Sequence, residues 1–406
     1  MLPAPPPRSA FPWYLASSGL WMAGISLQGF LFTWLLIGVL ETPAAAAGAA
    51  RSIAEFPPLL VLLLGGLLGD RIEGRRYLGA MHLLMALPPL LIAAVYLAGL
   101  LNYWWVVVFG ILTASIQALS DPARQSALSR VALLDVQRAV TVMTVFTSLV
   151  GIGGIYLGGN LERLGLGPVL LVQSGLFLLG LIAVAHLPRM PIPAAAAMRL
   201  REGLQTLWQV PLIRNIIGLN LLSSLFNAGA YIIAIPFIVK AVYLGGAEMF
   251  ATVMIVFTAG SVGSNILLLF FMPLLRPGRL FLYMQLTRIV VLGILMLQPE
   301  PWLFYFMMFC WGLNMGVTTT LVRATVQELA PPAARAQILS VLLLSFLVSS
   351  PLSSLLLGLL IAETSPLDAL LPGIAISLLI FLLGARSSGL WDYRSTGLPL
   401  QLPVKT

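Results

Sequence analysis

Few side chains within the long apolar stretches of this sequence can carry a charge, so those few are the first candidates for chemistry. Glu55 follows Arg51 by four residues, and on a helix this spacing places two side chains one turn apart, where they can form an ion pair. A partly desolvated carboxyl beside a cation can gain or lose a proton as its surroundings change. Glu55, together with Arg51, is therefore a candidate for coupling a process to protons, and a purely structural ion pair is the alternative.

Four other reactive residues lie in or beside apolar stretches. Arg288 is close to the middle of the stretch 280–298, and we expect its long side chain to extend along the helix to the polar boundary. Contact with an anionic group of a substrate is the alternative for Arg288. His82 and His186 lie near the ends of stretches, and we assign them no role. The single cysteine, Cys310, excludes a disulfide framework and a multi-cysteine metal site.

Neutral polar residues form a stripe along the seventh apolar stretch. They recur at i, i+3, i+4, i+7 and i+11, which is one face of a helix. The residues of this stripe are Asn220, Ser223, Ser224, Asn227 and Tyr231. A polar helix face finds no hydrogen-bond partners in lipid, so we expect it to face either a cavity or a neighbouring helix with which it can form hydrogen bonds.

The elements that position these residues follow from composition. Of the 406 residues, 59% are hydrophobic and only 9% are charged, and the mean hydropathy is +1.00, whereas a soluble domain carries roughly a quarter charged residues. The solvent is therefore lipid, in which every backbone polar group must be paired internally. The apolar runs show no strand alternation, so we expect an all-α integral membrane protein.

Apolar runs bounded by charges, Pro or Gly predict twelve spans, each near the length of about 20 residues that crosses a bilayer. The predicted spans cover 11–39, 48–69, 77–100, 103–122, 138–160, 167–187, 215–239, 247–274, 280–298, 301–322, 337–361 and 367–385. The first span is too long for the apolar region of a signal peptide, so we expect no cleaved signal.

The positive charges predict the orientation of these spans. Eighteen of the 22 Lys and Arg residues fall in loops on the side of the N-terminus, against Arg51, Arg163 and Lys240 on the other side. Positive residues are retained in the cytoplasm. We therefore expect a multi-pass protein of the bacterial inner membrane with both termini in the cytoplasm.

The chain divides into two similar halves. We expect an N-terminal six-helix half at 1–187, a cytoplasmic linker at 188–214, a C-terminal six-helix half at 215–386 and a cytoplasmic tail at 387–406. The fourth span ends with Asp121-Pro-Ala-Arg124-Gln, and the tenth ends with Thr320-Leu-Val-Arg323-Ala. Two parallel six-helix repeats are an architecture of transporters.

The loop Gly65-Gly-Leu-Leu-Gly-Asp70-Arg71-Ile-Glu73-Gly74-Arg75-Arg76 resembles the signature loop of the major facilitator superfamily. Glu73, with the stretches 122–128 and 326–331, is similar to the subgroup of the enterobactin exporter and macrolide efflux proteins. The resemblance implies a major facilitator fold in which the loop gates the cytoplasmic side. The gating candidates are Asp70, Arg71, Arg75, Arg76 and Arg124. Asp70 could pair with Arg124, and the alternative is that these charges only set orientation.

The resemblance also implies that spans one, four, seven and ten line the substrate cavity. The candidates on spans one, four and ten are Trp21, Gln28, Thr113, Gln117, Trp311 and Asn314, in addition to the stripe of span seven. Neutral amides and aromatic rings suit an amphipathic or weakly charged substrate. Two departures from exporters of this family weaken the case for proton antiport: Gly154-Ile-Tyr-Leu-Gly158-Gly159 lacks the proline of their fifth-span pattern, and span one carries Gln28 in place of an acidic residue.

We therefore expect a secondary transporter that works by alternating access and exports an amphipathic small molecule, such as a siderophore, a macrolide-like compound or a lipid-derived metabolite, with proton antiport as the candidate coupling. Uncoupled uptake, a lipid or lysolipid carrier, and a non-transporting sensor or scaffold are alternatives. No nucleophile, base or metal-ligand grouping and no nucleotide loop occurs, so we expect no enzyme, cofactor or metal. The expected partners are a small-molecule substrate, the lipid bilayer and, for antiport, protons, with no nucleic acid. The oligomeric state is left open, with a monomer as the default.

Overall fold

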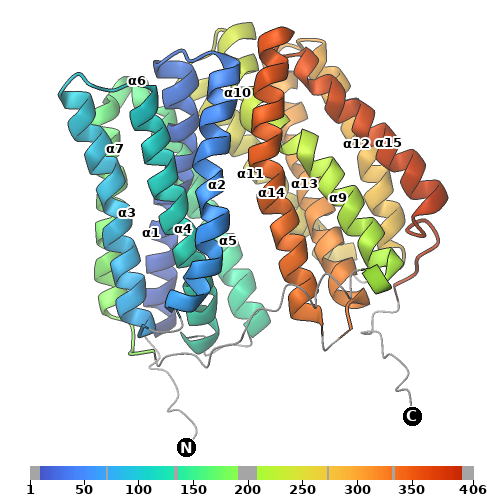
Figure 1. The fold of residues 1–406 in the computed structure, drawn as a ribbon, viewed down its shortest axis with the longest axis horizontal. Coiled ribbons are helices and arrows are strands. Elements are labelled where there is room, and N and C mark those ends of the chain that lie inside the picture. The colour runs from blue at the N-terminus through green and yellow to red at the C-terminus, as the bar shows by residue number, and fades with distance from the viewer. Residues whose placement is uncertain are drawn as a thin grey trace, which may run out of the picture. The chain divides into compact units, whose positions relative to one another are not determined.

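The structure is a computed structural model that describes residues 10–69, 72–131, 136–190, 208–271, 274–331 and 334–395 (Figure 1). Within these ranges all regular structure is helical. This agrees with the expectation from composition, because helices satisfy their own backbone hydrogen bonds in lipid.

Among the described residues, six long helices occupy the first half of the chain. They are α1 (Ala10–Trp34), which continues as the π-helical turn η1 (Leu35–Val39), α2 (Ala44–Gly69), α3 (Gly74–Leu97), α4 (Tyr103–Val131), α5 (Val136–Gly159) and α7 (Leu166–Ala185), with the single turn α6 (Leu161–Leu164) before α7. The loop before α3 is closed by Glu73, whose carboxylate accepts hydrogen bonds from the backbone N–H groups of Arg75 and Arg76. These contacts satisfy donors that the first helical turn leaves unpaired.

Six further long helical segments lie in the part of the second half that the structure describes. The first runs through α9 (Pro211–Gly229), η2 (Ala230–Ala234), α10 (Ile235–Phe237) and η3 (Ile238–Val242); it is followed by α11 (Ala247–Phe271), α12 (Pro277–Met296), α13 (Pro301–Leu329), α14 (Arg335–Glu363) and α15 (Leu371–Ser387), the last preceded by the short turn η4 (Asp368–Leu370). The first span of each half ends in a π-helical turn.

The predicted spans agree with these helices. Within the described residues, ten helices are long and apolar enough to cross a membrane, and α2 and α13 occupy the places of the second and tenth predicted spans. One difference matters for the site: α4 continues to Val131, past the predicted end at 122. The assignment of Arg124 to a loop was therefore wrong, and so was that of Arg323, because both lie inside helices.

The chain separates into two compact units. The first contains residues 1–196 and 243–255, and the second contains 197–242 and 256–406. In the first unit α1 packs on α5 and α7, and α3 packs on α7 and α4; in the second, α9 packs on α14 and α15, and α12 packs on α15 and α13. The same neighbours by order along the chain occur in both units, as expected for two copies of one six-helix pattern.

Close approach of backbones explains the glycines of the fifth span. A Cβ built on Gly154 would lie 2.2 Å from the carbonyl oxygen of Ala23, so α5 can pack this closely on α1 only with glycine at that position. Gly153 has open space at the same point. In the second unit the hydroxyl of Ser353 on α14 accepts a hydrogen bond from the backbone N–H of Gly229. Small residues thus bring helices together in both units.

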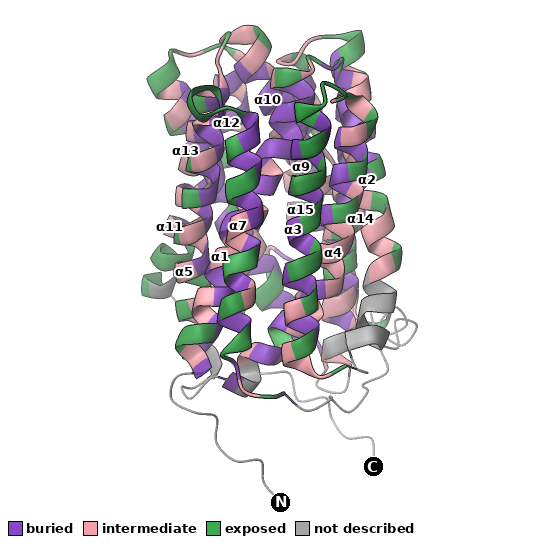
Figure 2. Ribbon diagram, turned by 90° about the vertical axis from the view of Figure 1, so that its left-hand side faces the viewer, coloured by how far each residue is buried: buried purple, intermediate pink, exposed green. Residues whose placement is uncertain are grey.

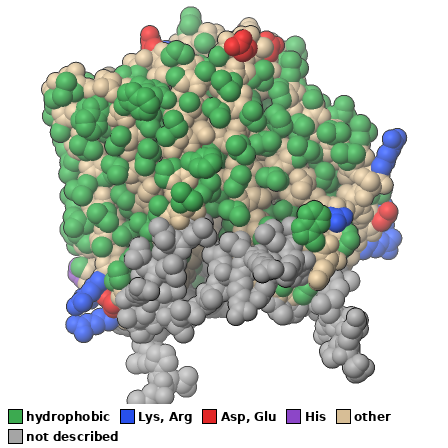
Figure 3. Space-filling view, viewed as in Figure 1, with side chains coloured by type: hydrophobic (Ala, Val, Ile, Leu, Met, Phe, Trp, Pro, Cys, Tyr) green, Lys and Arg blue, Asp and Glu red, His purple; other side chains and the backbone are tan. Residues whose placement is uncertain are grey.

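The outward sides of the helices are apolar. On α3, for example, Leu83, Leu87 and Leu97 are exposed, whereas Tyr77, Met81 and Met85 are buried, and Figure 2 shows buried and exposed positions on opposite sides of individual helices. On the face drawn in Figure 3, hydrophobic side chains cover the middle and most charged side chains lie near the edges. Exposed leucines at membrane depth contact lipid.

Candidate functional site

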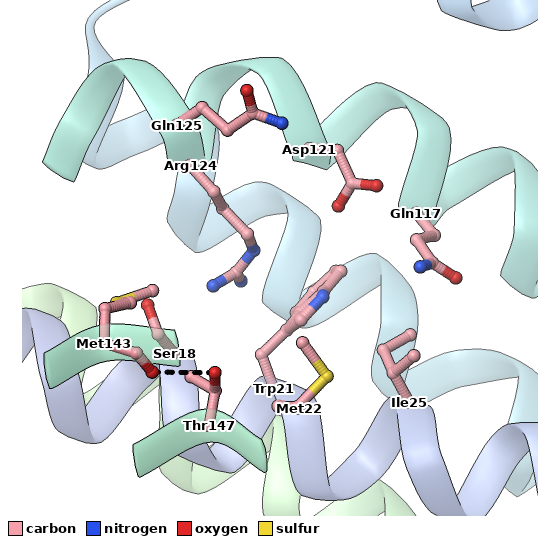
Figure 4. A pocket seen from close by; sticks show the side chains of 10 residues that line it. All are labelled: Ser18, Trp21, Met22, Ile25, Gln117, Asp121, Arg124, Gln125, Met143 and Thr147. Carbon is pink, nitrogen blue, oxygen red and sulfur yellow. Dashed lines mark hydrogen bonds between the residues drawn. The ribbon is translucent and has the colours of Figure 1, made fainter. Parts of the chain in front are cut away.

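A cavity of about 160 Å³ lies inside the first unit, among α1, α4 and α5 (Figure 4). Apolar side chains form one part of its lining, and amides, hydroxyls and two charged groups form the rest. The lining residues are Ser18, Trp21, Met22, Ile25, Gln117, Asp121, Arg124, Gln125, Met143 and Thr147. The structure thus brings together three of the residues proposed from sequence, Trp21, Gln117 and Arg124.

Arg124 is held rigidly at this cavity. Its guanidinium lies 3.8 Å from the centre of the Trp21 ring, and its Nε donates to the Ser120 hydroxyl at 2.9 Å. One Nη donates to Nε2 of His82 at 2.9 Å, and the hydroxyl of Tyr14 donates to the Arg124 carbonyl at 2.5 Å. The side chain is 7% exposed, so these contacts replace the water that a buried cation has lost.

His82 acts as a hydrogen-bond acceptor for this arginine. Its Nδ1 lies 3.0 Å from the carbonyl oxygen of Phe177, and because a carbonyl can only accept, Nδ1 carries the proton. Nε2 is then free to accept from Arg124 and from the hydroxyl of Ser17, which lies 3.1 Å away. The imidazole is buried and connects α3 with α1, α4 and α7.

Asp121 is the carboxylate of the cavity. It lies one turn before Arg124 on α4 and points into the pocket (Figure 4). Within the described residues its carboxylate makes no hydrogen bond and no ion pair within 4.0 Å, and the positive charge that acts on it is that of Arg124. A carboxylate in this setting can take up a proton or face a cation.

Two other predicted cavity residues form a separate buried network. The Gln28 amide donates to the hydroxyl of Thr113 at 3.0 Å and accepts from the amide of Gln173 at 2.8 Å. Gln173 is fully buried. Gln28 and Thr113 therefore connect α1, α4 and α7 through hydrogen bonds between helices, which is the alternative use of buried amides in membranes.

The predicted gating loop is described in part. Asp70 and Arg71 lie outside the described residues. Arg75 donates to the carbonyl of Leu187 at 3.1 Å, whereas Arg76 is exposed.

Glu73 joins the same loop to the chain segment that follows α7. Its carboxylate accepts from the backbone N–H of Met190 at 2.6 Å. Partial burial by itself raises the pKa of the Glu73 carboxyl, but the N–H groups of Met190, Arg75 and Arg76 together with the Arg75 charge lower the pKa below its ordinary value.

The predicted pair of Arg51 and Glu55 forms in α2. Arg51 Nε lies 2.5 Å from Glu55 Oε1, and the side chains are 23% and 19% exposed. The guanidinium also lies 5.5 Å from the centre of the Phe32 ring on α1. The geometry agrees with the prediction of an ion pair, and a coupling role for it stays a prediction.

The second unit contains a buried arginine that the sequence interpretation placed wrongly. Arg288 is 4% exposed, so its side chain does not extend along the helix to the polar boundary. It reaches across the bundle and donates to Asn314 Oδ1 on α13 at 2.8 and 3.1 Å, and to the Ser223 hydroxyl on α9 at 2.5 Å. The hydrogen bonds that Arg288 makes inside the bundle stabilise its side chain more than hydration at the polar boundary would, because that boundary lies several helical turns away.

The remaining members of the seventh-span stripe line the interior of the second unit. Asn220, Ser223 and Asn227 are buried and Ser224 is half-buried. Tyr231 stacks on Phe257 with ring centres 4.0 Å apart, and both rings lie edge-on to Trp311.

Sequence reasoning missed several residues of these networks, among them His82, Asp121 and Gln173. His82 was assigned no role, Asp121 was read as part of a repeat pattern, and Gln173 was not considered. The available signal was the extension of helical periodicity beyond 122, which would have placed Asp121 and Arg124 on one face of α4. The partners of His82 come from other helices, and no local pattern shows them.

The comparisons with known proteins agree with this architecture. The sequence pattern that describes the Major Facilitator Superfamily matches residues 14–354. The chain belongs to the Major Facilitator Superfamily. No curated protein sequence matches it significantly.

Solved structures of this superfamily are similar over nearly the whole chain. A mutant of the nucleoside transporter NupG has a TM-score of 0.72 at 13% identity, over 92% of this chain and 98% of that one. A bacterial homologue of the human lysosomal transporter Spinster, in an inward-facing and occupied conformation, gives 0.69 at 13% identity, with 94% and 98% covered. A D-xylose-proton symporter gives 0.69 at 14%, with 96% and 99% covered. At these identities the likeness establishes the major facilitator fold alone.

Proposed function

We propose that this chain is a secondary transporter that exports an amphipathic small molecule by alternating access, and that the first-unit cavity is part of its substrate site. The observation that carries the proposal is the lining of that cavity. Trp21, Met22 and Ile25 offer an apolar wall, and Gln117 and Asp121 offer polar and charged groups. Sites of this mixed composition bind ligands that have an apolar body and a few polar groups.

The proposal includes proton antiport, with Asp121 as a coupling candidate beside Glu55. Asp121 lies at the cavity without a hydrogen bond from the described residues, so its protonation would change the charge that the substrate meets. Glu55 is already paired with Arg51 on its own helix, whereas Asp121 lines the cavity. We therefore place Asp121 ahead of Glu55 as the group that exchanges a proton.

Gating, topology and assembly complete the proposal. Asp70, Arg71, Arg75 and Arg76 form the cytoplasmic gate, with the loop anchored through Glu73. The protein is a monomer in the bacterial inner membrane, and both of its termini lie in the cytoplasm. The linker at 188–214 joins the two halves. The arginine distribution supports the orientation.

The test is transport in proteoliposomes with an imposed pH gradient, using a siderophore, a macrolide, a cationic dye and a lysolipid as separate candidate substrates. Ile25→Trp fills the cavity, and Leu84→Trp, on the lipid-facing side of α3, is the matched control. We expect flux to follow the gradient, to be lost in Ile25→Trp and to persist in Leu84→Trp. Equal flux in both variants would remove the cavity from the transport route.

Two carboxylate variants separate the coupling candidates. Asp121→Asn should leave substrate exchange between equal pools intact while abolishing its response to the pH gradient. Glu55→Gln should leave that response in place. Flux that ignores the gradient in the wild-type protein would favour an uncoupled or lipid carrier, and no flux for any compound would favour a sensor or scaffold. Asp70→Asn tests the gate separately, and it should impair flux without changing substrate binding.

A further inference from the structure

The second unit carries a buried positive charge without an acidic partner. Arg288 is 4% exposed, and within the described residues no carboxylate lies within 4.0 Å of its guanidinium. The acidic residues of the second half, Glu248, Glu300, Glu328, Glu363, Asp368 and Asp392, all lie at or beyond helix ends. None of these second-half residues lies in the interior of a span, where it could neutralise Arg288, and a buried charge without a counter-charge is costly.

The neutral groups around Arg288 use most of its donors. Nε and one Nη2 hydrogen are taken by Asn314 Oδ1. The two Nη1 hydrogens go to Ser223 Oγ and, at 3.3 Å, to Gln285 Oε1. The orientation of the Asn314 amide is fixed, because its Nδ2 donates to the carbonyl of Met284 and the hydroxyl of Thr287. One of the five guanidinium hydrogens then has no acceptor among the described residues.

A second donor on the neighbouring turn of α9 also lacks an acceptor. Asn220 is 3% exposed, and its Nδ2 has no hydrogen-bond partner among the described residues. It lies one turn before Ser223 on the same helix face, as Gln285 lies one turn before Arg288 on α12. Farther along α9, Asn227 has an unpaired Oδ1, while its Nδ2 donates to the Ser223 carbonyl. The cluster therefore combines a positive charge with two donors that lack an acceptor among the described residues.

We propose that this cluster is a binding site for a small anion, either an inorganic ion such as chloride or a carboxylate group of an organic molecule. Arg288 supplies the charge, and Asn220 supplies hydrogen bonds that no described residue accepts. The contrast with the first unit supports the assignment. There the buried Arg124 has Asp121 one turn away and a histidine acceptor, whereas the described residues that accept hydrogen bonds from Arg288 are all neutral. The proposal does not depend on whether the first-unit cavity carries substrate.

The experiment measures thermal unfolding of the purified full-length protein in detergent, followed by tryptophan fluorescence at constant ionic strength. Sodium gluconate is replaced stepwise by sodium chloride in one series and by sodium acetate in another. We expect a saturable rise in the unfolding temperature with at least one of these ions. A response to chloride alone assigns an inorganic ion, and a response to acetate alone assigns an organic carboxylate.

Variants locate the effect. Arg288→Gln should abolish the anion response, and Asn220→Leu should weaken the apparent affinity roughly tenfold, which corresponds to about 1.4 kcal/mol. Arg279→Gln removes a positive charge from the same helix and should keep the full response. If Arg288→Gln does not fold, Asn220→Leu and direct binding of radioactive chloride to the wild-type protein decide the question. A wild-type protein that shows no saturable response to either ion, or a response that persists in Arg288→Gln, would overturn the proposal.

Discussion

Removal of the acceptor that holds Arg124 gives the sharpest test of the first-unit network. His82→Leu takes away Nε2, which accepts from the Arg124 guanidinium at 2.9 Å and from Ser17 at 3.1 Å. A hydrogen bond to a charged group contributes roughly 1.5–3 kcal/mol and a neutral one about 0.5–1.5 kcal/mol. Leucine fills much of the ring volume, so we expect a loss of about 2–4 kcal/mol of unfolding free energy.

This loss is large enough to measure as a shift of the unfolding temperature. For a unit of this size each kcal/mol corresponds to roughly 2–4 °C, so His82→Leu should lower the midpoint by about 5–15 °C. The assay is thermal unfolding in detergent, monitored by fluorescence. The control is His186→Leu, because His186 is exposed, stacks on Trp13 near the start of α1 and hydrogen-bonds to the carbonyl of Ile182 on its own helix. Surface changes of this kind usually stay within about 0.5 kcal/mol.

A double variant distinguishes this reasoning from simple loss of packing. When His82→Leu is combined with Arg124→Met, the buried cation is removed together with its acceptor, and such paired replacement is often close to neutral. We therefore expect the double variant to be more stable than His82→Leu alone. If the two changes were additive, or the double variant were the least stable, the network would be held by ring packing and the account of Arg124 given above would be refuted.

Three further predictions follow from individual contacts. Glu73→Ala should lower stability at neutral pH by roughly 0.5–2 kcal/mol, as for other caps. Because the pKa of Glu73 is lowered in the folded protein, its contribution is present above the ordinary glutamate pKa of about 4.3 and is lost as the pH falls through the folded pKa. The unfolding free energies of the two proteins, measured from pH 7 downward, should therefore converge, and a constant difference would contradict this. Gly154→Ala should destabilise the protein by about 1–3 kcal/mol or more, since the new Cβ would meet the Ala23 carbonyl. Gly153→Ala, where the Cβ would have open space, should stabilise the protein by roughly 0.5–1 kcal/mol. Equal unfolding midpoints of the two variants in detergent would show that the α1 and α5 backbones are not in close contact. Glu55→Gln should leave the pH dependence of transport unchanged, and a shifted pH profile of flux would return Glu55 to the role of coupling group.

The sequence by itself determined the class of the protein and the approximate position of its spans. Composition leaves lipid as the solvent, and twelve apolar runs separated by short polar loops can then form only helices, because no other open structure satisfies its backbone in hydrocarbon. The pair of Arg51 and Glu55 was also predictable, since i, i+4 spacing is a local geometry of the helix.

Only the tertiary structure decided how the buried charges are accommodated. Hydropathy ended the fourth span at its first charged residues and placed Arg124 in a loop, but α4 continues because His82 and Trp21, on α3 and α1, receive the guanidinium. Arg288 was expected to extend along its own helix, yet Asn314 and Ser223, on α13 and α9, accept its hydrogen bonds. In both cases the partners come from other helices, far away in the sequence. The energy of a buried charge depends on the neighbours that packing brings to it, and periodicity along one helix carries no record of them.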